Sequence, residues 1–390
     1  MGQPLSIERL ETFVVALPPR RPHLWVGLDS PAGNGYVVTK VLLSDGSVGW
    51  GEAQAIRTWG GDNARRYGET PATTVTLIHN CLKPALTGVD VRQVEVVHQK
   101  MNRALRGYPY AKAALEVAML DALGHSFKVP VYQLLGGKVR DRIPLAHSIG
   151  LMDAEAAARE AADVVAEGIR TLKVKIGVDI ERDVKVVRAV RQAIGPDARI
   201  RVDANQGYRN WRDGAEALRR MEEFDILYAE QLVDGLAGMA EIAARSNVPI
   251  MADESAWTDR DVVEIAQRRA AEYLSVYYTK PGGLVPAKRL LAVAGAFQMQ
   301  CDINGSGEMG VGNAANVHLA ASSPEITLAG TIPVTSTAEV QRTKVAGRKY
   351  LDDIVRQPFA YDDGHLVVPD GPGLGIEVDE AKLQKYSVAV

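Results

Sequence analysis

Eight short apolar segments alternate with amphipathic helical segments from about residue 142 to residue 330, and this alternation is the strongest constraint on the fold. The segments include IPLAHSIG (143–150), TLKVKIG (171–177), RIRVDANQ (199–206) and, at the end, EITLAG (325–330). Strands that alternate with helices build parallel sheets, and eight such units favour a closed barrel over an open sheet. The sequence therefore predicts an α/β fold built on a TIM-type barrel.

The residues before this alternation follow a different pattern. GYVVTKVLLSDGSVGWGEA (35–53) places two apolar runs around Asp45-Gly46, which is typical of a β-hairpin. Residues 110–127 space apolar side chains three and four apart, as a helix does. We therefore expect an α+β capping domain over residues 1–137, the barrel over 138–349, and a C-terminal segment, 350–390, that returns to the cap.

Ionisable residues recur at the carboxyl ends of consecutive predicted strands. Lys175, Asp203, Glu230 and Asp253 end strands two to five, at intervals of 28, 27 and 23 residues. Barrels build their active sites at this end, so the four side chains are expected at one level of one mouth. Three converging carboxylates repel one another unless a cation neutralises them, and oxygen ligands alone suit Mg²⁺.

Lys173 and Lys175 lie two residues apart in an apolar strand, so both amines point to the same side. One interpretation is an edge strand with a solvated face. The acids at the neighbouring strand ends favour another, in which the Lys173 ammonium lowers the pKa of Lys175 and makes it a base. Beside a metal-bound carboxylate, Lys175 would remove a proton from the adjacent carbon and leave an enediolate.

The overall composition excludes several classes of partner. The chain has 45 basic and 48 acidic residues, which gives no electrostatic reason to expect nucleic acid or an anionic membrane. The first residues lack the pattern of a secretory signal, and no apolar run is long enough to span a bilayer. Two cysteines, Cys81 and Cys301, fit a reducing compartment, so we expect a cytoplasmic protein that acts on a small molecule.

With these motifs the chain resembles the enolase superfamily, in its muconate lactonizing enzyme branch. The resemblance is carried by LKVKIG, by DANQ, by the EQ of YAEQL, by the DES of MADES, and by GWGEA and LLGG in the first domain. It implies a modified (β/α)7β barrel under an α+β cap that the C-terminal tail completes. It also implies a symmetric homo-oligomer, often an octamer.

Roles for individual residues follow from the resemblance. It implies that Mg²⁺ is held by Asp203, Glu230 and Asp253, and that Lys175, tuned by Lys173, is the acid/base. Asn205 and Glu254 would support the metal ligands, with surface or helix-capping roles as the alternative. Glu308 would be a functional carboxylate after strand seven, unless it is a solvated loop residue.

The chain departs from the branch at the end of strand six. Where the branch has a second lysine, in the pattern K-x-x-[KR]-x-G-G, this sequence has YYTKPGG (277–283), which puts Tyr277 at the acid/base position. Lys280 matches the later basic position, and strand alternation directs it away from the side that Tyr277 faces, unless the backbone is irregular there. Tyrosine is a poor base but can donate a proton, which favours one-base chemistry on Lys175.

A loop of the cap usually selects the substrate in this branch, and here it corresponds to residues 18–35. Its Arg21, His23 and Trp25, with Arg20 beside them, would meet an anionic or planar substrate, although an exposed basic loop is the alternative. GSGEMG (305–310) has the spacing of a dinucleotide motif, but it does not open a βαβ unit with the required acid, so nucleotide binding is not expected.

Three functions remain open on the sequence alone. The first is a Mg²⁺-dependent isomerase acting on a carboxylate, either a muconate-type cycloisomerase or an epimerase or racemase. The second is a lyase that dehydrates a hydroxy acid or a hydroxyproline-like substrate. The third is a non-catalytic carboxylate-binding relative, against which the intact Lys173, Lys175 and metal acids argue.

Overall fold

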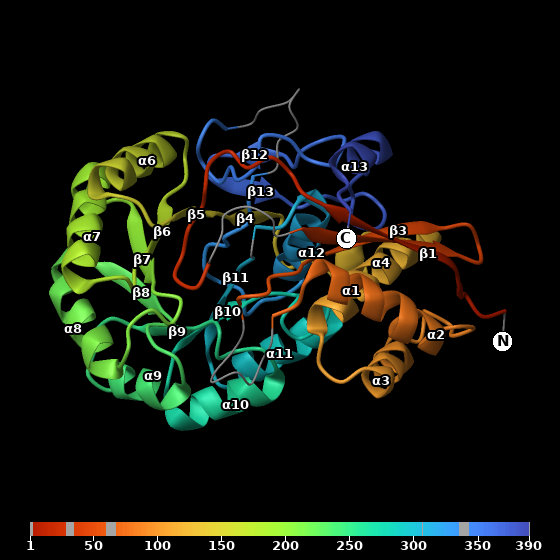
Figure 1. Cartoon of the computed structure of the whole chain (residues 1–390), viewed down its shortest axis with the longest axis horizontal. Coiled ribbons are helices and arrows are strands. Elements are labelled where there is room, and N and C mark those ends of the chain that lie inside the picture. The colour runs from red at the N-terminus through yellow and green to blue at the C-terminus, as the bar shows by residue number, and fades with distance from the viewer. Residues whose placement is uncertain (1–2, 29–34, 60–67, 306, 335–342, 390) are drawn as a thin grey trace.

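A computed structural model describes residues 3–28, 35–59, 68–305, 307–334 and 343–389. Figure 1 shows an arc of helices around a curled parallel sheet, and beside it a second domain built on a small antiparallel sheet. This is the predicted combination of a barrel with an α+β cap.

The cap is built from one antiparallel sheet and a group of helices. Its strands pair in the order β1 (Ile7–Val15), β2 (Tyr36–Leu43), β3 (Val48–Gln54). The predicted hairpin is confirmed, and Gly46 supplies the positive φ of 87° that its turn requires. The cap helices are α1 (Pro71–Leu77), a π-helical turn (Ile78–Leu82), α2 (Lys83–Ala85), α3 (Val94–Ala104), α4 (Pro109–Phe127) and α5 (Val131–Leu134).

Helix α4 lies directly against strand β3. A Cβ atom on Gly51 would lie 2.0 Å from the backbone oxygen of Ala114, and one on Gly49 would lie 2.2 Å from that of Ala118. Glycine at these two positions therefore lets the strand and the helix backbones meet without side chains between them. Since α4 is also buried on its other faces, it forms the centre of the cap core.

The barrel sheet contains seven parallel strands among the described residues. They are β5 (Ala146–Ile149), β6 (Thr171–Lys175), β7 (Arg199–Asp203), β8 (Ile226–Glu230), β9 (Ile250–Ala252), β10 (Tyr273–Val276) and β11 (Gln300–Ile303). The connecting helices are α6 (Ala154–Ala166), α7 (Ile180–Ile194), α8 (Trp211–Met221), α9 (Leu236–Ala243), α10 (Asp259–Arg268), α11 (Leu284–Ala296) and α12 (Gly310–Ala321), with a 3₁₀ turn at Glu222–Phe224.

Side-chain caps fix where several of these helices begin. Asp153, Asp179, Asn210 and Thr258 each accept a hydrogen bond from a backbone N–H in the first turn of α6, α7, α8 and α10. Each cap follows a strand after a short loop. The caps therefore help to hold the strand ends, and the side chains on them, at one level.

The predicted eighth strand, 325–330, is not a regular strand. Its backbone bridges to β11 at Ile326 and to Leu145 at Gly330, so it still lies between the two edges of the sheet. The N–H groups of Thr327 and Leu328 both donate to the carbonyl of Cys301, at 3.0 and 3.1 Å. Two donors on one acceptor break the ladder as a bulge does, and this interrupts the predicted alternation.

The C-terminal segment contacts both domains. Strands β12 (Tyr361–Asp362) and β13 (His365–Val367) form a small sheet with β4 (Arg142–Pro144) at the start of the barrel. Helix α13 (Glu380–Tyr386) lies near β1 (Figure 1). Beyond α13, the N–H of Val388 donates to the Val14 carbonyl at 2.8 Å, which extends the cap sheet at its β1 edge.

A buried glutamate joins the cap to the barrel. The side chain of Glu52 on β3 accepts hydrogen bonds from the N–H groups of Met309 and Gly312, both at 2.8 Å, at the start of α12. The Tyr278 hydroxyl donates to the Glu52 carbonyl at 2.6 Å. These contacts hold the cap beside the carboxyl ends of β10 and β11.

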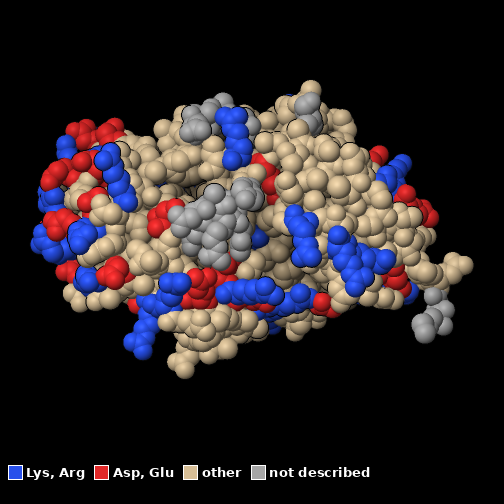
Figure 2. All heavy atoms as spheres, turned by 60° about the horizontal axis from the view of Figure 1, so that its bottom comes forward, with Lys and Arg blue, Asp and Glu red and all other residues tan. Residues whose placement is uncertain are grey.

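The surface carries charges of both signs. Figure 2 shows lysine, arginine, aspartate and glutamate side chains interspersed over one face, which agrees with the nearly balanced composition. No helix in the described part of the chain is both long and apolar enough to cross a membrane.

Candidate active site

A cavity lies between the cap and the carboxyl ends of the barrel strands. It encloses about 850 Å³ of empty space, counted out to its open mouth. The barrel contributes Lys173, Lys175, Asn205 and Tyr277 to its wall. Further wall residues come from β5, from the loop after β11, from cap loops and from the segment before β12, so all three parts of the chain meet here.

Strand register brings the predicted acids and lysines together. Lys175 pairs with Asp203 across β6 and β7, and Asp203 pairs with Glu230 across β7 and β8. Asp253 follows directly after β9. The four predicted strand-end residues therefore come to one level of the barrel, as their spacing predicted.

Both strand-β6 lysines contact Asp203. The Nζ of Lys175 lies 2.6 Å from Asp203 Oδ2 and 2.6 Å from Asn205 Oδ1. The Nζ of Lys173 lies 2.8 Å from Asp203 Oδ2 and 2.7 Å from Glu230 Oε1. Burial opposes the charged form of Lys173, but Asp203 and Glu230 outweigh it and raise the pKa of Lys173.

The carboxylates themselves are strongly perturbed. Burial would raise the pKa of Asp203, but the ammonium groups of Lys173 and Lys175 outweigh it and hold that pKa below its usual range. Glu230 is fully buried, and burial with the adjacent Asp203 charge raises its pKa well above the usual value. Within the described part of the chain, its Oε2 has no hydrogen-bond partner. A buried carboxylate oxygen without a partner costs free energy, which a bound cation would recover.

The donor set fits a hard divalent cation by its chemistry. Asp203, Glu230 and Asp253 supply oxygen atoms only, at the ends of successive strands, and Glu230 Oε2 is unsatisfied. Among the described residues, no three acidic, histidine or cysteine side chains already surround a common point. The lysine amines explain this, since the Asp203 and Glu230 oxygens are turned towards Lys173.

Two family matches and the solved structures identify the chain. Residues 9–136 match the mandelate racemase / muconate lactonizing enzyme N-terminal domain, and residues 156–382 match the enolase C-terminal domain-like family. The chain belongs to the mandelate racemase/muconate lactonizing enzyme family of the enolase superfamily. The resemblance seen in its motifs is thereby confirmed.

Its relatives in this family are isomerases. The chain is 31% identical over 386 residues to the N-succinyl-L-Arg/Lys racemase of Bacillus cereus, with 98% of each chain covered. It is 30% identical to a muconate cycloisomerase of Acinetobacter lwoffii, covering 98% of this chain and 97% of that one. The crystal structure of the B. cereus racemase superimposes with a TM-score of 0.89 at 30% identity, over 99% of both chains.

The two sequence candidates for the second acid/base position, Tyr277 and Lys280, both contact Asp253. The cavity wall contains Tyr277, whose hydroxyl donates to Asp253 Oδ2 at 3.3 Å. Burial and the Asp253 charge raise the pKa of Tyr277 well above its usual value, so the hydroxyl keeps its proton.

Lys280 is 2% exposed and is not in the wall. Its Nζ donates to Asp253 Oδ1 at 2.7 Å, to the Asp253 carbonyl at 2.9 Å and to the Ser275 carbonyl at 2.7 Å. These acceptors use all three N–H groups of an ammonium. The irregular backbone after β10 thus brings the buried Lys280 side chain into contact with Asp253, the same residue that Tyr277 contacts.

Asn205 and Glu254 lie beside the acids that the sequence predicts as metal ligands, and they contact each other. Asn205 Nδ2 donates to Glu254 Oε1 at 3.0 Å, and the indole N–H of Trp59 donates to the same oxygen at 3.2 Å. Burial, then Asp253 and Asp203, raise the pKa of Glu254 to about 8. Asn205 has a φ of 43° and Gln231, after Glu230, has 38°, so the strand ends hold backbone strain where the acids emerge.

The predicted cap loop reaches the cavity, but its arginines have an acidic partner. Arg20, Arg21, His23 and Trp25 line the wall, while residues 29–34 of the loop lie outside the described part. Arg21 forms two hydrogen bonds to Glu160 on α6, and Arg20 approaches the same carboxylate at 3.6 Å. Arg21 is therefore neutralised from the barrel side, a contact the sequence did not predict. His23 Nε2 lies 3.2 Å from Ser148 Oγ.

Glu308 is buried, not a solvated loop residue, and its charge acts on Lys349. The wall residues that sequence reasoning missed include Lys349 and Trp59. Neither lies at a strand end, so no periodic signal marked them. His318 on α12 accepts a hydrogen bond from the Tyr132 N–H at 3.2 Å, which fits a structural role. Ser306 of the GSGEMG segment lies outside the described residues.

Proposed function

We propose that this enzyme removes the proton next to a carboxylate of a small substrate, with Lys175 as the base. The observation that carries the proposal is the position of the Lys175 amine, in the cavity wall and 2.6 Å from Asp203. A base must reach the substrate while its partner groups orient it. Asp203 and Asn205 accept hydrogen bonds from the amine, and Lys175 on β6 lines the cavity.

Enzymes of the family are generally Mg²⁺-dependent. In this chain Asp203, Glu230 and Asp253 would hold the ion, supported by the contacts of Asn205 and Glu254. When bound, Mg²⁺ supplies positive charge that stabilises the enediolate formed as the proton leaves. Lys173 would remain an ammonium, since Asp203 and Glu230 raise its pKa, and would add positive charge at the same place.

The opposite face of the substrate decides the reaction type. Tyr277 lines the cavity and Lys280 is committed to Asp253 and Ser275, so we assign Tyr277 to the second face, where it offers a proton donor in place of the second lysine of the family pattern. Chemistry that needs one base therefore fits best, and the most specific form is a muconate-type cycloisomerisation. Epimerisation is a variant in which the Tyr277 hydroxyl delivers a proton to the second face.

A lyase is the second candidate function, and the Tyr277 hydroxyl favours it. In a dehydration, Lys175 would take the proton and Tyr277 would protonate the departing hydroxyl group of a hydroxy acid or hydroxyproline-like substrate. The non-catalytic alternative requires a site without a base, and the Lys175 position in the cavity wall argues against it.

We also propose a cytoplasmic homo-oligomer. The free thiols of Cys81 and Cys301 support a reducing compartment, and family membership supports a symmetric assembly such as an octamer. Light scattering at micromolar concentration tests the assembly, because a monomer of 42.1 kDa and an octamer are easily separated.

Deuterium incorporation tests the chemistry. The enzyme is incubated with Mg²⁺ in D₂O across muconates, N-succinylamino acids, dipeptides, hydroxy acids, hydroxyprolines and proline betaines, and products are followed by NMR and mass spectrometry. Deuterium at an α or ring carbon is expected with wild type and with Lys185→Ala, an exposed lysine on α7, and is expected to vanish in Lys175→Ala.

The products separate the alternatives. Ring closure or altered chirality, with no mass change other than that of the incorporated deuterium, identifies an isomerase, and a keto product identifies a lyase. Exchange that persists in Lys175→Ala would refute the role given to this residue. Exchange nowhere in the panel, with Mg²⁺ bound, would refute the proposed chemistry for these substrate classes.

A further inference from the structure

The turn between β10 and α11 carries both Tyr277 and Lys280, and its own backbone closes it. The N–H of Gly283 donates to the Tyr278 carbonyl at 2.8 Å. Gly283 has a φ of 142°, a backbone conformation that favours glycine. Contacts that hold either end of this turn therefore also fix the place from which the Tyr277 side chain leaves the backbone.

Glu116 of the capping domain holds the far end of the turn. Its carboxylate accepts hydrogen bonds from the N–H of Leu284 at 2.7 Å and from the N–H of Val285 at 2.9 Å. These are the first two residues of α11, and backbone N–H groups at the start of a helix have no acceptor within it. Gly283 precedes them and has no side chain that could accept from them. The first turn of α11 is therefore satisfied by a side chain from the other domain.

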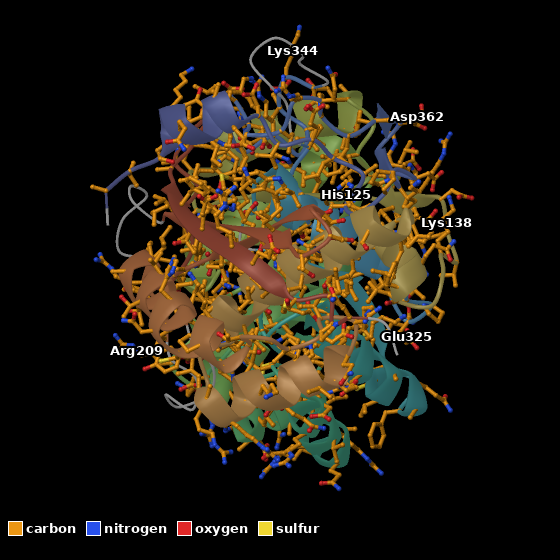
Figure 3. The ribbon with its side chains drawn as sticks, turned by 90° about the vertical axis from the view of Figure 1, so that its right-hand side faces the viewer. His125, Lys138, Arg209, Glu325, Lys344 and Asp362 are labelled. Atoms are coloured by element: carbon orange, nitrogen blue, oxygen red, sulfur yellow. The ribbon has the colours of Figure 1, made fainter. Side chains whose placement is uncertain are left out.

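The carboxylate of Glu116 is closely surrounded. Figure 3 labels His125 near the exposed end of α4, whereas Glu116 lies in the buried middle of the same helix and is 1% exposed. A Cβ atom on Gly283 would lie 2.4 Å from Glu116 Cδ, so glycine leaves room for the carboxylate. From α3, His98 Nε2 lies 3.1 Å from Glu116 Oε1. A buried carboxylate with three partners is held in one place.

Two further contacts tie the turn to the capping domain. The Tyr278 hydroxyl donates to the Glu52 carbonyl of β3, as described above. The Trp59 ring packs on the Tyr277 ring, with centroids 5.4 Å apart and planes inclined by 34°. The Tyr277 hydroxyl donates to Asp253 of the barrel at 3.3 Å. The Tyr277 side chain is thus held between the two domains.

We propose that Glu116 is a positioning residue for Tyr277, because its hydrogen bonds to α11 keep the turn, and with it the Tyr277 hydroxyl, in place at the cavity. This inference rests on the proposed function, which gives Tyr277 the proton for the second face of the substrate. Lys175 is held separately, on β6, by Asp203 and Asn205. Loss of the Glu116 contact should therefore displace the proton donor and leave the base in place.

Fluorine NMR tests the proposal without a substrate. 3-Fluorotyrosine is placed at position 277 and, in a second protein, at position 208, where the buried tyrosine after β7 donates to Asp183 at 3.0 Å. Glu116→Gln replaces one accepting oxygen by an amide NH₂ group, which cannot accept, so an N–H of α11 loses its partner. In this variant we expect the 277 resonance to shift, or to broaden beyond the wild-type linewidth, and the 208 resonance to stay unchanged. A general loss of stability would move both.

Two other variants keep the test decisive. Glu95→Gln is the matched control, because Glu95 on α3 is exposed and pairs with Arg289 on α11, so this change also removes a carboxylate contact between the two domains. It should leave the 277 resonance unchanged. Glu116→Asp keeps the charge but is one methylene shorter, so it cannot reach both N–H groups and should also shift the 277 resonance. It decides the result if Glu116→Gln does not fold.

Deuterium exchange provides an independent measurement. Exchange that depends on Lys175 is expected to persist in Glu116→Gln. An unchanged 277 resonance in the folded Glu116 variant, equal shifts at positions 277 and 208, or loss of exchange in Glu116→Gln while wild type retains it would overturn the proposal. Absence of exchange in wild type would refute the proposed function instead, and the fluorine resonances would still decide whether Glu116 positions Tyr277.

Discussion

Replacing Lys280 by methionine tests whether this residue is a structural partner of Asp253 or a second base. The Lys280 amine is buried and satisfied by three acceptors on Asp253 and Ser275. Methionine is close in length and apolar, so it fills the same space without the charge. In this variant the Tyr277 hydroxyl, at 3.3 Å, is the one side-chain partner that the Asp253 carboxylate keeps among the described residues.

The expected cost follows from breaking a buried ion pair. Removing one partner leaves an uncompensated charge, which costs about 3 to 5 kcal/mol of unfolding free energy. We expect this loss in Mg²⁺-free buffer, because Asp253 is then without a neighbouring cation of its own. Mg²⁺ should narrow the difference in unfolding free energy between Lys280→Met and wild type, because the released Asp253 carboxylate binds the ion more tightly in the variant. Mg²⁺ at about 100 times the Kd adds about 2.7 kcal/mol to the unfolding free energy of the protein that binds it.

The assay is urea unfolding followed by tryptophan fluorescence, with and without Mg²⁺. The control is Lys185→Met on the exposed face of α7, which should change the unfolding free energy by less than about 0.5 kcal/mol. A Lys280→Met protein as stable as wild type without Mg²⁺, but unable to exchange deuterium, would refute the structural role and make Lys280 a base.

Two further changes test other parts of the structure. Burial would raise the pKa of Glu160, but hydrogen bonds from His147 and Arg21 outweigh it and hold that pKa at about 2, below its ordinary 4.5. The stability that the Glu160 carboxylate contributes is therefore complete above about pH 4.5 and is lost as the pH falls towards 2. Urea unfolding of Glu160→Gln should show a deficit at pH 7 that shrinks below pH 4.5, and a deficit independent of pH would contradict this. Gly51→Ala, whose Cβ would lie 2.0 Å from the Ala114 oxygen, should lower the unfolding free energy by about 1 to 3 kcal/mol more than Gly46→Ala, measured by the same unfolding assay, and equal losses would contradict the close packing of β3 on α4.

The sequence could predict the barrel and the level of its charged residues because both follow from local periodicity. Asp203, Glu230 and Lys175 each stand at the end of an apolar run, and parallel register then brings them together. The hairpin at Asp45-Gly46 was predictable for a similar reason, because an Asp-Gly pair between two apolar runs favours a tight turn.

Other features depend on contacts between distant segments. Glu160 pairs with Arg21 from 139 residues away, and Lys349 reaches the cavity through the segment before the last hairpin. Strand alternation predicts that Lys280 faces away from the side of Tyr277. Strand β10 ends at Val276, however, and the turn that follows brings the Lys280 amine to Asp253. The eighth strand could not be predicted as irregular, because its bulge arises from two donors on Cys301.

The pairing of Val388 with Val14 has a consequence for how the chain folds as it is made. Strand β1 is the edge of the cap sheet, and the outer backbone groups at its end, at Val14 and Val15, are paired by residues that are synthesised more than 370 positions later. The barrel strands between them are complete before that partner exists. The growing chain must therefore carry an open sheet edge throughout synthesis of the barrel, a period in which an unpaired edge invites association with other chains.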